Sequence, residues 1–228
     1  MARLPRFDLA GHLHLVVQCA RVERPPFVDD VDRRRYLSAM LDASRQHDLG
    51  VHAYALLNDR VLLLASPGRA GAVADFMQSV GRQYVKAFNH RHGRSGPLWD
   101  GRYRATVVEP ASHLIACIRL VEQAPVRERL ASRPGDWPWS SAAHHLGSKI
   151  DGIVTEHPAY WQLGNTPFER EARYGRESAI LLDDAEAASL LSAAWHGWPV
   201  GSDTYVEEVA KLSDRPTRPR LRGRPPRR

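Results

Sequence analysis

Residues 51–67 contain two apolar runs joined by an Asn-Asp-Arg turn, and this pattern constrains the fold more than any other stretch of the chain. The runs are Val51–Leu57 and Val61–Ala65, and turn residues of these types tolerate the backbone conformations of a tight connection. The segment therefore predicts a β-hairpin. Because strand side chains alternate between the faces of a sheet, Arg60 and Leu62 are expected on one face of the second strand.

Apolar periodicity places this hairpin inside a longer order of elements. The other expected elements of the core are strands at His12–Cys19 and Arg102–Glu109 and helices at Asp30–Asp48 and Ala70–Arg91. The order strand, helix, strand, strand, helix, strand is a split βαβ arrangement. It predicts an α+β fold, a ferredoxin-like sandwich with its helices on one face of an antiparallel sheet.

The segments that follow this core differ from it in composition and in their expected structure. A helix is expected at Ala111–Gln123 and is expected to stop at Pro125, with Leu120 and Ala124 at the margin of its buried stripe. Residues 131–165 are rich in Trp and are expected to wrap the core. Residues 166–212 are expected to form an acidic helical extension, with helices at Phe168–Glu177 and Asp183–Trp195 and a short one ending at Leu212. Residues 213–228 are rich in Arg, Pro and Gly, so we expect disorder until a partner binds.

Charge is distributed unevenly along the 228 residues. The formal net charge is +6, but residues 211–228 hold eight Lys or Arg and one acid, which leaves the rest of the chain at −1. Within that remainder, residues 82–104 carry six basic side chains and one acid, whereas residues 167–210 carry three basic side chains and nine acids. One surface is therefore expected to attract phosphate and another to repel it.

Several classes of protein are not indicated by the sequence. No apolar run approaches twenty residues and the first eight residues are too polar for a secretory signal, so a cytoplasmic, nucleoid-associated location is expected. Cys19 and Cys117 lie in apolar segments without a CxxC partner, which favours buried small side chains over a disulfide or a zinc site.

Short motifs in a fixed order resemble a known family. They are Met1-Ala2-Arg3-Leu4-Pro5-Arg6, His14, Gln18, Phe27-Val28-Asp29-Asp30, Tyr36-Leu37, His52-Ala53-Tyr54, Phe76-Met77-Gln78, Gly81-Arg82-Gln83-Tyr84-Val85, Phe88-Asn89, the dense stretch from His92 to Tyr103, Pro125-Val126-Arg127 and Asp136-Trp137-Pro138-Trp139-Ser140-Ser141. In order and spacing they resemble the REP-associated tyrosine transposases, bacterial members of the single-tyrosine HUH superfamily. The resemblance covers nearly the whole chain, and it implies that residues 1–130 form a ferredoxin-fold DNA-binding domain.

The residues that carry catalysis in that family are missing here. In the family two histidines on the hairpin hold a divalent cation, Mg²⁺ or Mn²⁺, that polarises the scissile phosphate of single-stranded DNA. The matching positions are Arg60 and Leu62. The nucleophilic tyrosine and an amide four residues later would fall at Leu120 and Ala124. None of these side chains supplies a metal ligand or a nucleophile, so we expect no catalytic residue, no metal site and no cofactor.

Other residues are candidates for contact with nucleic acid. A stretch of helix and loop interleaves cations with aromatic rings, the mixture that binds a phosphate backbone and stacked bases. Its candidate residues are Arg82, Arg91, Arg94, Trp99, Arg102 and Arg104. In the tail, Arg222 and Arg224 belong to an Arg-Gly-Arg-Pro sequence that matches the core of a minor-groove AT-hook, with unspecific phosphate binding as the simpler interpretation.

These observations favour a catalytically silent transposase relative that binds single-stranded or hairpin DNA. A first alternative is an active metal-dependent nickase with rearranged residues, in which His12 and His14 lie beside Arg60 and Leu62 and a tyrosine such as Tyr84 or Tyr103 attacks. A second alternative is an interaction remnant that touches no nucleic acid. The family's usual target, a hairpin beside repetitive extragenic palindromes, is itself open here, because Cys19-Ala20-Arg21 stands where relatives have Arg-Gly-Asn. Oligomeric state is not predicted.

Overall fold

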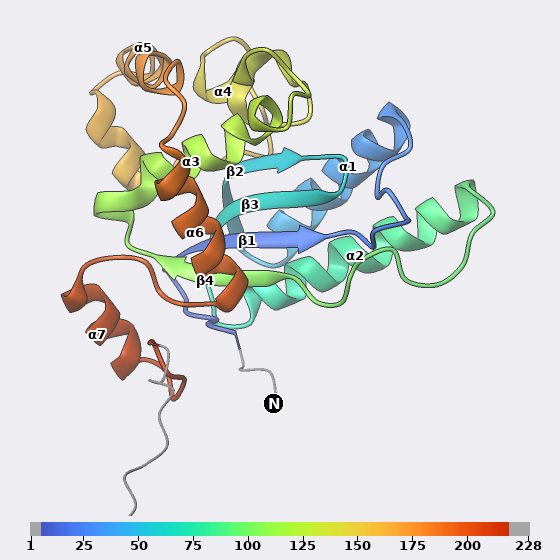
Figure 1. Cartoon of the computed structure of the whole chain (residues 1–228), viewed down its shortest axis with the longest axis horizontal. Helices are drawn as coiled ribbons and strands as arrows, with labels where there is room; N and C mark the ends of the chain where they lie inside the picture. The colour runs from blue at the N-terminus through green and yellow to red at the C-terminus, as the bar shows by residue number, and fades with distance from the viewer. Residues whose placement is uncertain (1–5, 219–228) are drawn as a thin grey trace, which may run out of the picture.

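A four-stranded antiparallel sheet forms the centre of the molecule (Figure 1). The computed structural model describes residues 6–218. The strands are β1 (Leu13–Cys19), β2 (Leu49–Leu56), β3 (Arg60–Pro67) and β4 (Arg104–Val108), and their order in the sheet is β2-β3-β1-β4. The predicted hairpin is confirmed as β2 and β3, and β1 lies between β3 and β4, as a split βαβ requires.

Two helices pack on one face of the sheet. They are α1 (Asp30–Gln46) and α2 (Ala72–Arg91). The α1 helix begins at Asp29, whose carboxylate accepts hydrogen bonds from two backbone amides of the first turn. Apolar side chains of both helices pack against the strand residues that point to this face, so the predicted ferredoxin-like core is confirmed.

The opposite face of the sheet is covered as well. The α3 helix (Pro110–Arg127) and α6 (Asp184–His196) lie across it (Figure 1), and α5 (Pro167–Ser178) packs on α3 from the side away from the sheet. The prediction that α3 stops before Pro125 is wrong, because Pro125 lies inside the helix. A proline lacks only its own backbone donor, and this one sits in the last turn, where the helix loses a single hydrogen bond.

Extended segments cover both edges of the sheet. At the β2 edge the amide of Leu56 donates to the carbonyl of Trp139, and the amide of Thr155 donates to that of Val51. The chain around these residues contains the short helices η1 (Pro134–Asp136), α4 (Ala142–His145) and η2 (Pro158–Leu163). At the β4 edge Val200 forms a parallel bridge with Val108 and leads into α7 (Asp203–Lys211). Both edge strands are thereby shielded from pairing with another chain.

A buried carboxylate connects these outer segments to α3. Glu122 is fully buried and accepts hydrogen bonds from the Ser141 hydroxyl, from Nδ1 of His145 and from the Tyr174 hydroxyl. The last two distances are 2.7 Å and 2.6 Å. A buried carboxylate needs such partners to offset its lost hydration, so this network fixes α3 relative to α4 and α5.

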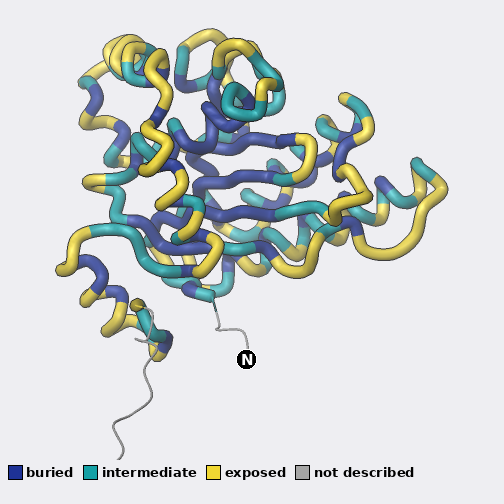
Figure 2. Tube along the Cα trace, in the orientation of Figure 1, coloured by how far each residue is buried: buried dark blue, intermediate teal, exposed yellow. Residues whose placement is uncertain are grey.

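The chain remains ordered beyond the expected start of the tail. Disorder was predicted from residue 213, but Arg215 is only 7% exposed. Its guanidinium lies over the ring of Phe7, 4.4 Å from the ring centroid, which gives this part of the chain a partner that composition does not reveal. Figure 2 shows how burial concentrates in the strands and in the helix faces that contact them. None of the helices within residues 6–218 is long and apolar enough to cross a membrane.

Candidate nucleic-acid interface

The four positions that the sequence resemblance matches to catalytic residues are Arg60, Leu62, Leu120 and Ala124. They lie on one side of the sheet, and three of them pack in an apolar cluster. Leu62 on β3 and Leu120 on α3 are each 1% exposed, and Ala124 is 6% exposed. All three belong to the same hydrophobic cluster between the sheet and α3. The expectation that Leu120 and Ala124 lie at the margin of the helix is therefore wrong, because η2, α5 and the chain leading into α6 cover α3 away from the sheet.

Arg60 completes this group at the rim of the cluster. Its guanidinium forms an ion pair with Glu128 at the end of α3 and a second one with Asp59 at 2.9 Å. A cation joined to two carboxylates does not bind a metal ion, and the leucine and alanine side chains have no donor atoms. The residues at these positions therefore do not fit a divalent cation. Within residues 6–218 no three His, Cys, Asp or Glu side chains are grouped so that they could hold a metal.

The alternative histidine pair is not placed where the rearranged-nickase hypothesis needs it. His14 pairs with Ala65 on β3, three residues beyond Leu62, and alternation along β1 directs it to the opposite face of the sheet. His14 is fully buried, and its burial lowers the pKa of the imidazole to about 4. The suggestion that His12 and His14 lie beside Arg60 and Leu62 is thus wrong.

The two tyrosines of that hypothesis are also held in structural roles. The Tyr84 hydroxyl donates to the carbonyl of Pro26, and burial raises the pKa of this phenol. Tyr103 lies under the guanidinium of Arg6, 3.8 Å from the ring centroid, and burial raises its pKa too. A raised pKa disfavours the phenolate, the form in which a tyrosine attacks phosphorus.

A groove along α2 contains part of the predicted interface. It has a volume of about 760 Å³ and runs between α2 and the loop at residues 97–101. Among the described residues that line it, Arg21, Arg82 and Lys86 are charged, and none is a carboxylate. Trp99 closes one side: its ring meets Tyr36 edge to face at 5.9 Å, so part of the indole packs on the core while part faces the groove.

The other predicted residues fall in different places. Arg91 forms ion pairs with Asp29 at 2.5 Å and with Asp32 at 2.6 Å, and its guanidinium holds the pKa of Asp29 well below the usual range. Two carboxylates neutralise this cation, which reduces its attraction for phosphate. Arg94 lies 5.9 Å from the centroid of the Phe88 ring, at the start of the exposed loop. Arg222 and Arg224 lie outside the described residues.

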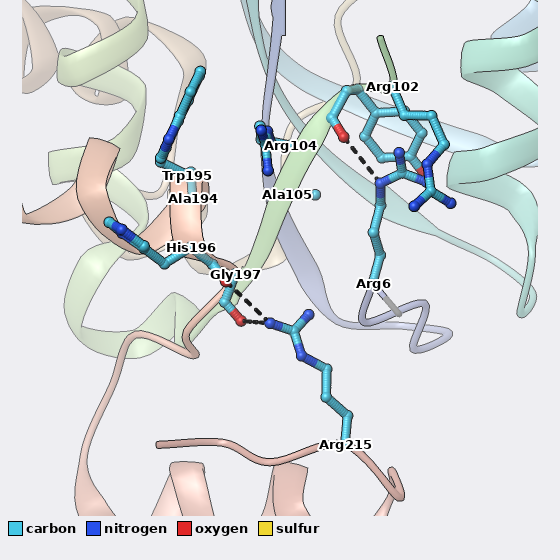
Figure 3. Close-up of a pocket in the computed structure, with 10 residues that line it drawn as sticks. Arg6, Arg102, Arg104, Ala105, Ala194, Trp195, His196, Gly197 and Arg215 are labelled. Carbon is cyan, nitrogen blue, oxygen red and sulfur yellow. Dashed lines mark hydrogen bonds between the residues drawn. The ribbon is translucent and has the colours of Figure 1, made fainter. Parts of the chain in front are cut away.

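Arg102 and Arg104 line a separate pocket on the β4 side of the molecule (Figure 3). The pocket has a volume of about 220 Å³ and lies between β4, the end of α6 and the chain around Arg215. Arg6 and Arg215 are its other charged lining residues. The sequence prediction did not include these two arginines, nor Arg21 and Lys86 in the α2 groove. Lys86 has a sequence signal, since it is one helical turn from Arg82, but Arg6 and Arg215 are brought together only by the fold.

A comparison with solved structures finds a chain of the same fold. No family model matches the chain and no curated protein matches it. A solved structure of a REP-associated tyrosine transposase bound to a REP hairpin is similar with a TM-score of 0.53 and 18% identity, covering 70% of this chain and 96% of the other. A putative transposase from Deinococcus radiodurans R1 has a TM-score of 0.37 and 19% identity, covering 57% of this chain and 94% of that one. The first of these shows that the chain shares the fold of a REP-associated tyrosine transposase.

Proposed function

We propose that this chain is a relative of the REP-associated tyrosine transposases that binds single-stranded or hairpin DNA at the nucleoid and does not cleave it. The observation that supports binding is the α2 groove, where the described lining residues include three cations and one tryptophan and no carboxylate. Such a groove offers positive charge to a phosphate backbone and a flat ring to a base. The neighbour with the same fold was solved with a hairpin, which supports DNA as the partner.

The proposed loss of cleavage depends on chemistry at the four family positions. An arginine paired with acids and three buried apolar side chains offer no attacking oxygen and no cation ligand. The fold is retained while the groups that open a phosphodiester are replaced. Binding without cleavage is the function that this combination supports best.

A binding experiment tests the proposal. Fluorescence anisotropy with a labelled hairpin, a single strand and a duplex of equal length should rank the first two above the third. The double substitution Arg82→Ala and Lys86→Ala should weaken binding of the preferred DNA about tenfold, because it removes two cations from the groove. The matched control is Arg173→Ala with Arg176→Ala, which removes two exposed cations from α5. Equal losses in both variants, or no binding at low salt, would contradict the proposal and favour an interaction remnant.

A second measurement addresses cleavage. The hairpin is incubated with the protein and Mg²⁺ or Mn²⁺, and denaturing gels are searched for a covalent protein–DNA band or a nicked strand. We expect neither product. A band that disappears in a tyrosine-to-phenylalanine variant would instead establish an active enzyme with rearranged residues.

A further inference from the structure

Two parallel rows of residues on α2 form one wall of the α2 groove. Residues four apart on a helix lie one above the other on the same face. The first row is apolar and consists of Met77, Gly81 and Val85. The second row lies beside it, is polar and consists of Gln78, Arg82 and Lys86. This wall therefore offers an apolar strip directly alongside a strip that carries two cations.

Gly81 leaves a gap in the apolar row, between Met77 and Val85, which we call the notch. Beyond its chain neighbours and the backbone of its own helix, a Cβ atom at Gly81 would meet no heavy atom of the described residues within 4 Å. The residue lies inside α2, where glycine is less stable than alanine. Neither packing nor backbone conformation in the free protein requires glycine here, whereas a ligand that approaches the helix backbone would.

The second wall of the groove is the loop at residues 97–101, and it carries Trp99. The backbone of this loop is tied to β1, because the amide of Asp100 donates to the carbonyl of Cys19 at 2.9 Å. The indole itself is partly buried against the core, where it meets the ring of Tyr36. Trp99 is thus held in position before any ligand binds, which lowers the entropic cost of binding.

An unpaired nucleobase has the chemistry that this groove requires. A base is a flat ring that stacks on an indole, and it is joined to phosphates that cations attract. A phosphate backbone alone would need the cations but neither the ring nor the notch. The groove volume of about 760 Å³ lies within the roughly 300–1,000 Å³ of sites that enclose small organic groups. In a duplex the faces of the bases are covered by their neighbours, and only their edges are open to a protein.

We propose that the α2 groove takes an unpaired base of a DNA loop or single strand, which stacks on Trp99 and enters the notch at Gly81. The neighbouring phosphates then lie along the row that contains Arg82 and Lys86. This inference rests on the proposed function and specifies which part of the DNA the groove contacts. It also gives a physical reason for a preference for hairpin and single-stranded DNA over duplex.

The test uses the full chain and two labelled hairpins with the same stem. One has a loop of thymidines, and the other has an abasic loop of the same length. The two probes carry the same number of phosphates and differ only in the unpaired bases. Fluorescence anisotropy should show that the thymidine loop binds about tenfold more tightly, because stacking on Trp99 is lost with the bases. We call this ratio of affinities the loop preference.

Substitutions at Gly81 separate the notch from the stability of the helix. Gly81→Ala and Gly81→Met should raise the midpoint of thermal unfolding by about 2–4 °C, since both residues favour a helix over glycine. They should nevertheless reduce the loop preference, and Gly81→Met should abolish it. Gly175→Ala is the matched control, because Gly175 also lies inside a helix and its added Cβ would make an ordinary contact with Leu146 at 3.8 Å. This control should raise stability and keep the loop preference.

A third variant, Trp99→Leu, removes the stacking ring and should also abolish the loop preference. The Gly81 variants keep the test decisive if the loss of this partly buried ring impairs folding. Equal binding of the two hairpins by the wild type would overturn the inference and leave the proposed function intact. A loop preference that survives Gly81→Met, or that is lost equally in Gly175→Ala, would overturn it as well. No binding of either hairpin at low salt would contradict both the inference and the proposed function.

Discussion

At the residue scale, buried histidines make the stability of the fold depend on pH. Burial lowers the pKa of His14 and of His52 to about 4, below the value near 6.5 expected in the unfolded chain. The unfolded chain therefore binds more protons at these two imidazoles between these pH values, so their contribution to stability is fully present above pH 6.5 and is lost as the pH decreases toward 4. The loss is roughly 3 kcal/mol at most for each imidazole.

Urea unfolding between pH 7.5 and 5 measures this loss. Burial also lowers the pKa of His144 and His157, so His14→Leu removes one of several titrating imidazoles. It should flatten the dependence of unfolding free energy on pH, whatever it does to stability at neutral pH. His90→Leu is the control, because His90 is exposed on α2. A profile as steep in the His14 variant as in the wild type would show that His14 is not responsible.

Single residues also show where the sequence stops being informative. The alternation along β3 places Leu62 on the correct face. Helical periodicity predicted Leu120 and Ala124 at the margin of the buried face of α3, but both side chains are buried. Periodicity locates the face of a helix that meets its largest neighbour. It does not predict that Tyr160 and Tyr174, which are distant in sequence, cover the side of α3 that faces away from the sheet. The sequence does not predict the hydrogen-bond partners of Glu122 for the same reason, since they come from separate segments.

At the scale of elements, residues 198–201, here called the strap, pair with the edge of β4 and are an unexpected part of the sheet. The amide of Val200 donates to the carbonyl of Val107 at 2.9 Å, and the amide of Glu109 donates to the carbonyl of Val200 at 2.8 Å. The sequence predicted the strands and the order of the core, because each has a local apolar pattern. The strap has a Trp-Pro-Val-Gly sequence with no strand periodicity, and its pairing depends on where the sheet ends.

This pairing leads to an element-scale prediction. Val200→Pro removes the donor to Val107 and should lower stability by about 1–3 kcal/mol, since a buried carbonyl loses its partner. Val200→Ala is the matched control, because it keeps the amide and loses only side-chain packing. Thermal unfolding of the three proteins gives the difference, and amide exchange at Glu109 reports the strap directly. Equal stability of the Pro and Ala variants would show that the strap contributes through its side chains alone.

At the scale of the whole molecule, charge is divided between regions that the structure separates. The described residues that line the α2 groove include three cations and no carboxylate, whereas α5 and α6 belong to the acidic stretch of the chain. The sequence predicted this division. It did not predict that Arg82 and Arg102, close in sequence, serve different cavities, because a loop between them turns the chain from α2 into β4.

The tail is a second source of positive charge beside the α2 groove, and truncation separates its contribution from that of the folded body. Residues 219–228 contain five arginines, and a chain ending at Arg218 keeps Arg215 in the pocket. If all five contact phosphates of a single strand, the slope of log affinity against log salt should fall by roughly 3.5 on truncation, at about 0.7 for each contact. Anisotropy across a salt series measures it for full-length and truncated chains. An unchanged slope after the first truncation would exclude the tail from the interface, and the DNA would then be held by the folded body alone.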